Sequence, residues 1–162
     1  MERKIEGAPS VRRADSGDVE AIAALINSAF RVEAFFIEGD RIDVPEVRAL
    51  MAKGTVLLAP ASDGRIAACV YLEIQGERGY FGLLSVDPSL QGGGFGRQLV
   101  AEAEDVCRAA GCEVMEIWVV NLRQELPPFY RRLGYVETGT EPFPATKPTK
   151  QPCHFLRMSK PL

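Results

Sequence analysis

A glycine cluster, Gln91-Gly92-Gly93-Gly94-Phe95-Gly96, stands between an apolar run that ends at Val86 and a segment of helical periodicity. The start of a helix gathers main-chain N–H groups that have no intrahelical partner, and the helix dipole adds partial positive charge there. Glycine lets the chain approach an anion closely, and Arg97 can add a full charge. The cluster therefore predicts a phosphate-binding loop. The alternative is a glycine-rich turn that serves only tight helix packing.

Two common phosphate-binding patterns do not fit this cluster. A P-loop requires Gly-Lys followed by Ser or Thr, and no such sequence follows Gly96. A dinucleotide-binding fingerprint requires a third glycine at the position that Arg97 occupies. The cluster alone therefore predicts an anion site without naming the phosphate compound.

Metal and disulfide chemistry are disfavoured by the residues that would supply it. The chain has four cysteines, Cys69, Cys107, Cys112 and Cys153, and one histidine, His154. No Cys-x-x-Cys pair occurs, and a stable zinc site needs about four convergent nitrogen or sulfur ligands. We expect reduced, buried thiols and no metal.

Apolar periodicity indicates the elements that precede the cluster. Helical spacing from Val19 to Phe30 follows a cap at Asp15-Ser-Gly-Asp18, and a second short helix begins near Asp43 and stops at Gly54. Three apolar runs then follow, separated by turn residues, which predicts an antiparallel meander. The runs are Thr55 to Ala59, Ile66 to Ile74 and Tyr80 to Val86.

The segment after the cluster predicts a parallel strand pair. A helix with Leu99 and Ala110 on its apolar face ends at Gly111, and Val114 to Val120 is nearly all apolar, as in a strand covered on both sides. Strand, loop, helix and strand in this order form a βαβ unit. A short helix over Leu126 to Leu133, strands over Tyr135 to Thr138 and Phe155 to Met158, and a long loop over Gly139 to Pro152 complete the chain. The predicted fold is α/β (α+β) with a mixed sheet.

Length and composition limit the classes of protein. The 162 residues suit a single domain spanning 1–162, and 46% hydrophobic with 25% charged residues is typical of a globular protein. A formal net charge of -3 gives no general field for nucleic acid or anionic lipid. Met1 to Arg13 lacks the apolar core of a signal peptide, and no apolar run reaches the roughly 20 residues of a membrane span. We expect a cytoplasmic protein that binds neither nucleic acid nor membrane.

Three sequence features together resemble the GNAT superfamily of N-acetyltransferases. Leu84-Ser85-Val86-Asp87-Pro88 followed by the glycine cluster is similar to the family signature R/Q-x-x-G-x-G/A. Asn121 ends the next predicted strand, and Phe129 to Tyr135 is similar to the family's tyrosine motif, in which glycine and an aromatic residue follow the tyrosine. The resemblance covers roughly Val11 to Lys160. It implies about four helices and a mostly antiparallel sheet whose two central parallel strands splay apart.

The resemblance also implies how acetyl-CoA, the acyl donor, is held. The main-chain N–H groups of Gln91 to Gly96, with Arg97, would hold the pyrophosphate of coenzyme A. Leu84 and Val86 would pair with the pantetheine arm through main-chain groups, and Asn121 would contact pantetheine. The implied activity is direct transfer of an acetyl group to an amine of a small molecule, peptide or protein.

Such a transfer needs an acid, an oxyanion donor and a way to deprotonate the amine. Tyr130 is the predicted acid for the departing thiolate, and the N–H of Val86 is the predicted oxyanion donor. Many relatives carry a glutamate on the strand before the glycine cluster, and this chain has none there. Glu73 and Glu116 are the substitute bases, each with the alternative of being an ordinary solvated or hydrogen-bonded carboxylate. Ser85 could order a water instead.

The acceptor and the assembly are left open by the sequence. The segment Phe30 to Asp43 offers aromatic rings and the acids Glu33, Glu38 and Asp40, whereas Gly139 to His154 offers cations. These cues point to opposite charges on the acceptor. The apolar end Phe155 to Leu162 permits a homodimer. A catalytically silent module that binds acyl-CoA for sensing or scaffolding is the alternative function, and an unrelated nucleotide-binding fold is a second one.

Overall fold

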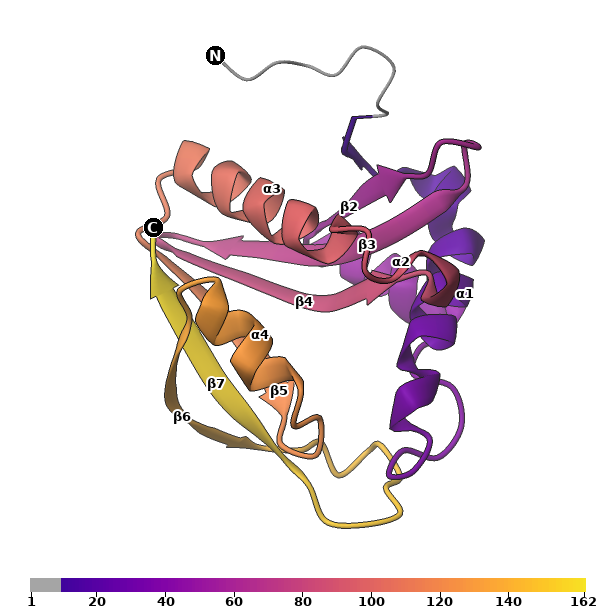
Figure 1. Cartoon of the computed structure of the whole chain (residues 1–162), viewed down its shortest axis with the longest axis vertical. Helices are drawn as coiled ribbons and strands as arrows, with labels where there is room; N and C mark the ends of the chain where they lie inside the picture. Colours follow the sequence, from indigo (N-terminus) through magenta and orange to yellow (C-terminus); the bar gives the residue numbers. More distant parts are fainter. Residues whose placement is uncertain (1–9) are drawn as a thin grey trace.

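The computed structural model describes residues 10–162, so most of Met1 to Arg13 lies outside the described residues. Its centre is a seven-stranded sheet in the order β1-β2-β3-β4-β5-β7-β6 (Figure 1). Only β4 and β5 pair in parallel, and the other neighbours are antiparallel, which confirms the predicted mixed sheet. The strands are β1 (Arg12–Arg13), β2 (Thr55–Pro60), β3 (Ile66–Gln75), β4 (Arg78–Val86), β5 (Val114–Val120), β6 (Val136–Pro142) and β7 (His154–Pro161).

Four α-helices cover the two faces of the sheet (Figure 1). They are α1 (Val19–Ala29), α2 (Val44–Lys53), α3 (Phe95–Ala109) and α4 (Leu126–Arg132), joined in part by the 3-10 turns η1 (Ser16–Asp18), η2 (Phe30–Glu33) and η3 (Pro88–Leu90). The Asp15 side chain accepts a hydrogen bond from the Gly17 N–H, and the Asp43 side chain caps α2 through the Glu46 N–H. The caps lie where the sequence predicts them, because Asp accepts hydrogen bonds from N–H groups at helix starts.

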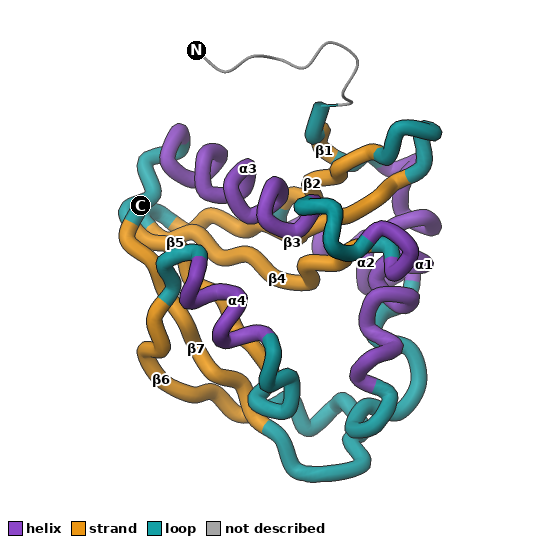
Figure 2. Tube along the Cα trace, viewed as in Figure 1, coloured by secondary structure: helices purple, strands orange, loops and turns teal. Residues whose placement is uncertain are grey.

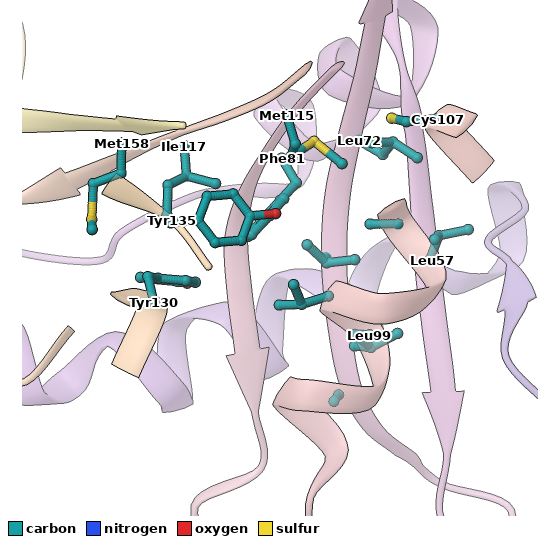
Figure 3. Close-up of a cluster of buried hydrophobic side chains, with 14 of the residues drawn as sticks. Leu57, Leu72, Phe81, Leu99, Cys107, Met115, Ile117, Tyr130, Tyr135 and Met158 are labelled. Atoms are coloured by element: carbon teal, nitrogen blue, oxygen red, sulfur yellow. The ribbon is translucent and has the colours of Figure 1, made fainter. Parts of the chain in front are cut away.

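The helices divide the apolar side chains into two main layers. Ile22 and Ile26 of α1 pack with Val47 of α2 against one face of the sheet, and Leu99 and Ala103 of α3 pack against the other. Figure 3 shows the layer under α3 and α4, where Phe81, Tyr130 and Tyr135 lie close together. The ring centroids of Phe81 and Tyr130 are 6.0 Å apart and those of Tyr130 and Tyr135 are 5.9 Å apart. This aromatic cluster fixes α4 against the sheet.

The parallel pair β4–β5 opens soon after it begins. Its register joins Arg78–Tyr80 of β4 to Val114–Glu116 of β5, and the two strands then diverge toward their carboxyl ends (Figure 2). On its other side β4 carries a bulge against β3, and Leu83 within it has a φ of 54°. A bulge increases local twist and bends its strand, which accounts for the direction in which β4 departs.

The last two strands are longer than the sequence predicts. β6 and β7 pair from Val136↔Ser159 to Pro142↔His154, with an irregularity between Glu137 and Gly139. The sequence of β6 is mostly polar because only one face of this strand packs on the protein, so its apolar pattern is too weak to predict its full length. β7 lies between β5 and β6, so the outer edge of the sheet is β6. Dimerisation through the chain end stays a prediction.

Among residues 10–162, no helix combines the length and the apolar character needed to cross a bilayer.

A buried polar cluster connects α3 to the chain end. Glu104 of α3 is 6% exposed, accepts a hydrogen bond from the Tyr135 hydroxyl at 2.9 Å and pairs with Lys160 Nζ at 3.0 Å. Loss of one partner from such a pair leaves an uncompensated buried charge.

We therefore expect Lys160→Met to lower the free energy of unfolding by about 1–3 kcal/mol, measured by urea denaturation, because Lys160 is itself partly exposed. The double variant Glu104→Gln/Lys160→Met removes the charge as well and should regain part of this loss. A single variant as stable as the wild type would show that the pair contributes nothing to stability.

Candidate functional site

The opened strands enclose a cavity of about 160 Å³ that passes between the two layers. Tyr80, Gly82 and Leu84 of β4 form one wall, and Ile117 and Val119 of β5 form the opposite wall. The other lining residues are Phe81 and Leu83 of β4, Trp118 and Val120 of β5, Phe30 and Glu33 of η2, Arg41, Arg123 after β5, Leu126, Phe129 and Tyr130 of α4, and Phe155 of β7. A channel between two strands lets a donor on one side of the sheet reach an acceptor on the other.

Tyr130, the predicted acid, lies in the wall of this cavity. Its ring is 6% exposed and packs edge-on against Phe129 at a centroid distance of 5.0 Å. No hydrogen bond from its hydroxyl to any of residues 10–162 occurs, unlike the hydroxyl of Tyr135, which is bonded to Glu104. Burial raises the pKa of Tyr130 above its ordinary value, and the charge of Arg123 opposes this effect. The phenol is therefore protonated and free to donate.

A groove of about 490 Å³ adjoins the cavity on the side of α3 and α4. Five of the predicted cofactor-binding residues line it: Leu84, Val86, Gln91, Gly92 and Gly96. The groove and the cavity share part of their walls, namely Phe30, Leu84, Arg123, Leu126 and Phe129. The two spaces are therefore neighbours, and a long ligand in the groove can place its end in the cavity.

The glycine cluster forms the turn into α3. Gly92 and Gly94 have φ values of 87° and 84°, a backbone region that favours glycine, and Gly94 is the residue before the first helical turn. A Cβ atom added at Gly96 would lie 3.7 Å from Val86 Cγ2, which is an ordinary van der Waals distance. Gly93, Gly94, Phe95 and Arg97 are not part of the groove wall, and Arg97 is exposed. The first N–H groups of this 15-residue helix lack intrahelical acceptors.

Near its carboxyl end, the main chain of β4 has hydrogen-bonding groups on the side where β5 no longer pairs with it. The Asp87 N–H donates to the Ala67 carbonyl at 2.8 Å, and Val86 is opposite Ala68 in the ladder. Because alternate residues form the hydrogen bonds of an antiparallel ladder, the N–H and C=O of Val86 point away from β3. They are therefore available to a ligand, as the predicted roles in pantetheine and oxyanion binding require.

Asn121 directs its side-chain oxygen elsewhere. Its Oδ1 accepts a hydrogen bond from the His154 N–H at 2.8 Å, and its own N–H donates to the His154 carbonyl at 2.9 Å. These bonds connect the end of β5 to the start of β7. Asn121 lines neither the cavity nor the groove. Its predicted contact with pantetheine stays a prediction.

Glu73 and Glu116, the predicted bases, lie together at a different depression on the sheet, and neither lines the cavity with Tyr130. Glu73 accepts hydrogen bonds from the Tyr71 hydroxyl at 2.8 Å and from Gln75 at 2.7 Å. Burial favours a higher pKa for Glu73, but these bonds and the charge of Lys53 outweigh it and lower the pKa below the ordinary value. Glu116 is bonded to Arg78 and Trp118.

Three charged residues of the cavity escape the motif-based prediction: Glu33, Arg41 and Arg123. Glu33 and Arg123 are 90 positions apart in the sequence yet form a bridge of 2.9 Å. The loop between β6 and β7 contacts the segment that follows Glu33, since the Lys150 N–H donates to the Phe36 carbonyl at 2.8 Å. Glu33 is one of three acids in its segment, and no local pattern marks it out from Glu38 or Asp40.

The chemistry of the groove fits acetyl-CoA. An anionic diphosphate suits the exposed N–H groups at the start of α3, and an extended arm suits the free main-chain groups of Val86. The shared wall at Leu84 and Phe129 then leads toward Tyr130. Within residues 10–162 no three His, Cys, Asp or Glu side chains converge as a metal site would require.

Solved structures of acetyltransferases share this fold. An Escherichia coli ribosomal-protein-S18-alanine N-acetyltransferase is 16% identical with a TM-score of 0.75, and the alignment covers 94% of this chain and 92% of that chain. A nourseothricin acetyltransferase is 23% identical with a TM-score of 0.75, covering 95% and 98%. A Salmonella typhimurium protein, yncA, solved with its cofactor acetyl-CoA, is 21% identical with a TM-score of 0.72, covering 94% and 93%.

Comparison at the sequence level gives the family. No curated protein matches the chain significantly. Residues 20–135, which include η2, the glycine cluster and Tyr130, match the profile described as the acetyltransferase (GNAT) family. This match spans more than half of the chain. The protein therefore belongs to the GNAT family and is an acetyl-CoA-dependent acetyltransferase.

Proposed function

We propose that the protein transfers an acetyl group directly from acetyl-CoA to a primary amine of a small molecule, with Tyr130 as the acid. The observation that carries this proposal is the Tyr130 hydroxyl, which has no hydrogen-bond partner among residues 10–162 and belongs to a cavity that adjoins the groove of the glycine cluster. Acid, donor groove and acceptor space are thereby neighbours. A direct reaction needs all three in one place.

The residues divide the work between the two sides of the sheet. The N–H groups at the start of α3 hold the diphosphate, and Leu84 and Val86 hold the pantetheine arm through their main chain. Acetyl-CoA, when bound, supplies the activated acetyl group. The N–H of Val86 stabilises negative charge on the acetyl oxygen, and the Tyr130 hydroxyl gives its proton to the departing sulfur.

A route through an acetylated cysteine is disfavoured by the surroundings of Cys69. This thiol is 1% exposed, and burial raises its pKa to about 12, with a hydrogen bond involving Ser85 acting in the opposite direction. The thiolate is the nucleophilic form of cysteine, so Cys69 is unreactive near neutral pH. Cys69 belongs to the layer under α1 and α2 and does not itself line the cavity.

The size of the cavity supports a small acceptor. About 160 Å³ holds one compact group. Aromatic side chains on the acceptor side, Phe30, Tyr80, Trp118 and Phe155, suit an ammonium ion with an apolar stem. The fold neighbours carry names that refer to a ribosomal-protein alanine and to nourseothricin, so they do not restrict the acceptor further.

The test is release of free thiol from acetyl-CoA over a panel of amines: alkylamines, diamines, amino acids, aminoglycosides and short peptides. We expect turnover with at least one small amine and a product whose mass is increased by one acetyl group on nitrogen. CoA binding without turnover for any of the amines would contradict the proposed function and favour the sensor or scaffold alternative.

A further inference from the structure

Glu33 is a buried carboxylate in the wall of the central cavity. It is the last residue of η2 and is 3% exposed, whereas Glu38 and Asp40 in the same segment are exposed. Burial of a carboxylate is costly unless charges or hydrogen bonds compensate it. Glu33 lines the same cavity as Tyr130.

Only one of the two oxygens of Glu33 is occupied. Oε2 accepts a hydrogen bond from Arg123 Nη1 at 2.9 Å. Oε1 has no hydrogen-bond partner among residues 10–162. It also keeps some exposed surface, since Arg157 Nε is the one side-chain atom of that range that is both fully buried and without a partner. Oε1 is therefore free to accept a hydrogen bond, and Glu33 is part of the cavity wall.

The neighbouring charges leave Glu33 able to take a proton. Arg123 divides its guanidinium between Glu33 and Glu125, whose Oε1 accepts from Arg123 Nε at 2.5 Å. Burial is the largest effect on the pKa of Glu33 and raises it, and the charge of Glu125 acts in the same direction. The hydrogen bond from Arg123 and the charges of Arg123 and Arg41 lower this pKa, but the net change is an increase. Cys153 also lies close enough to sense the Glu33 charge. A raised pKa brings a carboxylate nearer to the pH at which a base must work.

We propose that Glu33 binds the ammonium group of the acceptor through Oε1 and removes one of its protons before acetyl transfer. The proposal rests on the proposed function. In this step an N–H bond breaks and an O–H bond forms on Glu33, so that the nitrogen keeps an electron pair for attack. A new N–C bond then replaces the C–S bond. The sulfur takes the Tyr130 proton, and the second proton lost by nitrogen restores the phenol.

The location of Glu33 distinguishes it from the two acids predicted from the sequence. Glu73 and Glu116 line another depression and are held by two or more partners each, whereas Glu33 shares the cavity with Tyr130. The two cations of the cavity, Arg41 and Arg123, lie over the Phe30 ring, with 5.6 Å and 6.0 Å between their Cζ atoms and the ring centroid. Glu33 is the one carboxylate among the lining residues, so it is the group there that can accept from an ammonium ion.

The kinetic test compares Glu33→Gln with Glu38→Gln, which removes the same charge from an exposed position of the same segment. The amide oxygen of the Glu33→Gln side chain can still accept from Arg123, so the fold should persist, which urea denaturation checks. We expect Glu33→Gln to lower kcat/KM at neutral pH about 100-fold and Glu38→Gln to leave it unchanged. The activity of Glu33→Gln should keep rising with pH as solvent deprotonates the amine. A Glu33→Gln enzyme with the rate and pH profile of Glu38→Gln would overturn the proposal.

A binding test separates this proposal from the proposed function. Trp118 is the single tryptophan of the chain and lines the cavity, so its fluorescence reports ligands there. With CoA present, n-butylammonium should bind Glu33→Gln at least about tenfold more weakly than wild type, and neutral n-butanol should bind both alike. If the wild type turns over and Glu33→Gln matches it in both ammonium affinity and rate, only the role of Glu33 is refuted. If the wild type does not turn over, the proposed function is refuted. The ammonium affinities of the two proteins then decide whether Glu33 binds the ammonium group.

Discussion

Tyr130→Phe is expected to lower kcat about 100-fold with little change in the affinity for CoA. The substitution removes one oxygen atom and leaves the ring, which packs against Phe81, Phe129 and Tyr135. The hydroxyl has no hydrogen-bond partner among the described residues, so its removal should not disturb the fold. Since burial holds the pKa of Tyr130 above its ordinary value, ionisation of this phenol should not limit the rate of the wild type at neutral or mildly alkaline pH.

Steady-state thiol release with the best amine of the panel measures this effect, and CoA titration measures the affinity. Tyr135→Phe is the matched control, because it removes a hydroxyl from the same aromatic cluster at a position outside the cavity. Tyr135→Phe loses the hydrogen bond to Glu104, so its free energy of unfolding should fall by about 1 kcal/mol while its kcat stays the same. Equal kcat for Tyr130→Phe and wild type would exclude Tyr130 as the acid.

Gly96→Asp is expected to weaken CoA binding by about 10- to 100-fold without unfolding the protein. Gly96 lies in the first turn of α3 and lines the groove. A carboxylate there competes for the N–H groups that a diphosphate needs and repels the diphosphate, while the helix dipole favours the new charge. The added Cβ has room, since the nearest atoms lie at 3.7 Å or more.

The matched control is Gly96→Ala, which adds the same Cβ without the charge and should change the affinity for CoA less than about threefold. Isothermal titration with CoA measures both variants, and thermal unfolding without ligand confirms that α3 is intact. If Gly96→Asp binds CoA as tightly as Gly96→Ala does, the diphosphate is not held at the start of α3.

Both experiments concern parts of the site that local sequence predicts well. The glycine cluster lies next to the strand and helix that position it, within 13 residues from Leu84 to Gly96, so short-range geometry determines its shape. The meander β2–β3–β4 and the caps of α1 and α2 are predictable for the same reason: apolar alternation, turn residues and capping side chains act over a few positions. The sequence predicts strands β6 and β7 that are too short, because the outer face of the pair is polar and the pairing is irregular near Gly139.

The acceptor side depends on contacts between distant segments. Glu33, Arg123 and Tyr130 come from η2, the segment after β5 and α4, and they meet only because β4 and β5 separate beyond Tyr80. A sequence shows three acids between Phe30 and Asp43, but burial of Glu33 and exposure of Glu38 follow from how η2 packs against the loop before β7. Likewise Glu73 and Glu116 share a depression because of how the strands that carry them lie in the sheet, not because of any pattern around them.

The sequence by itself therefore determined the family, and it predicted the donor loop and the candidate acid Tyr130, since these follow from residue types at short spacing. Only the tertiary structure decided which carboxylate joins Tyr130 in the cavity and which cations stand beside it. The physical reason is that the environment of a charged side chain, its burial and its partners, is set by residues as far away as the 90 positions between Glu33 and Arg123.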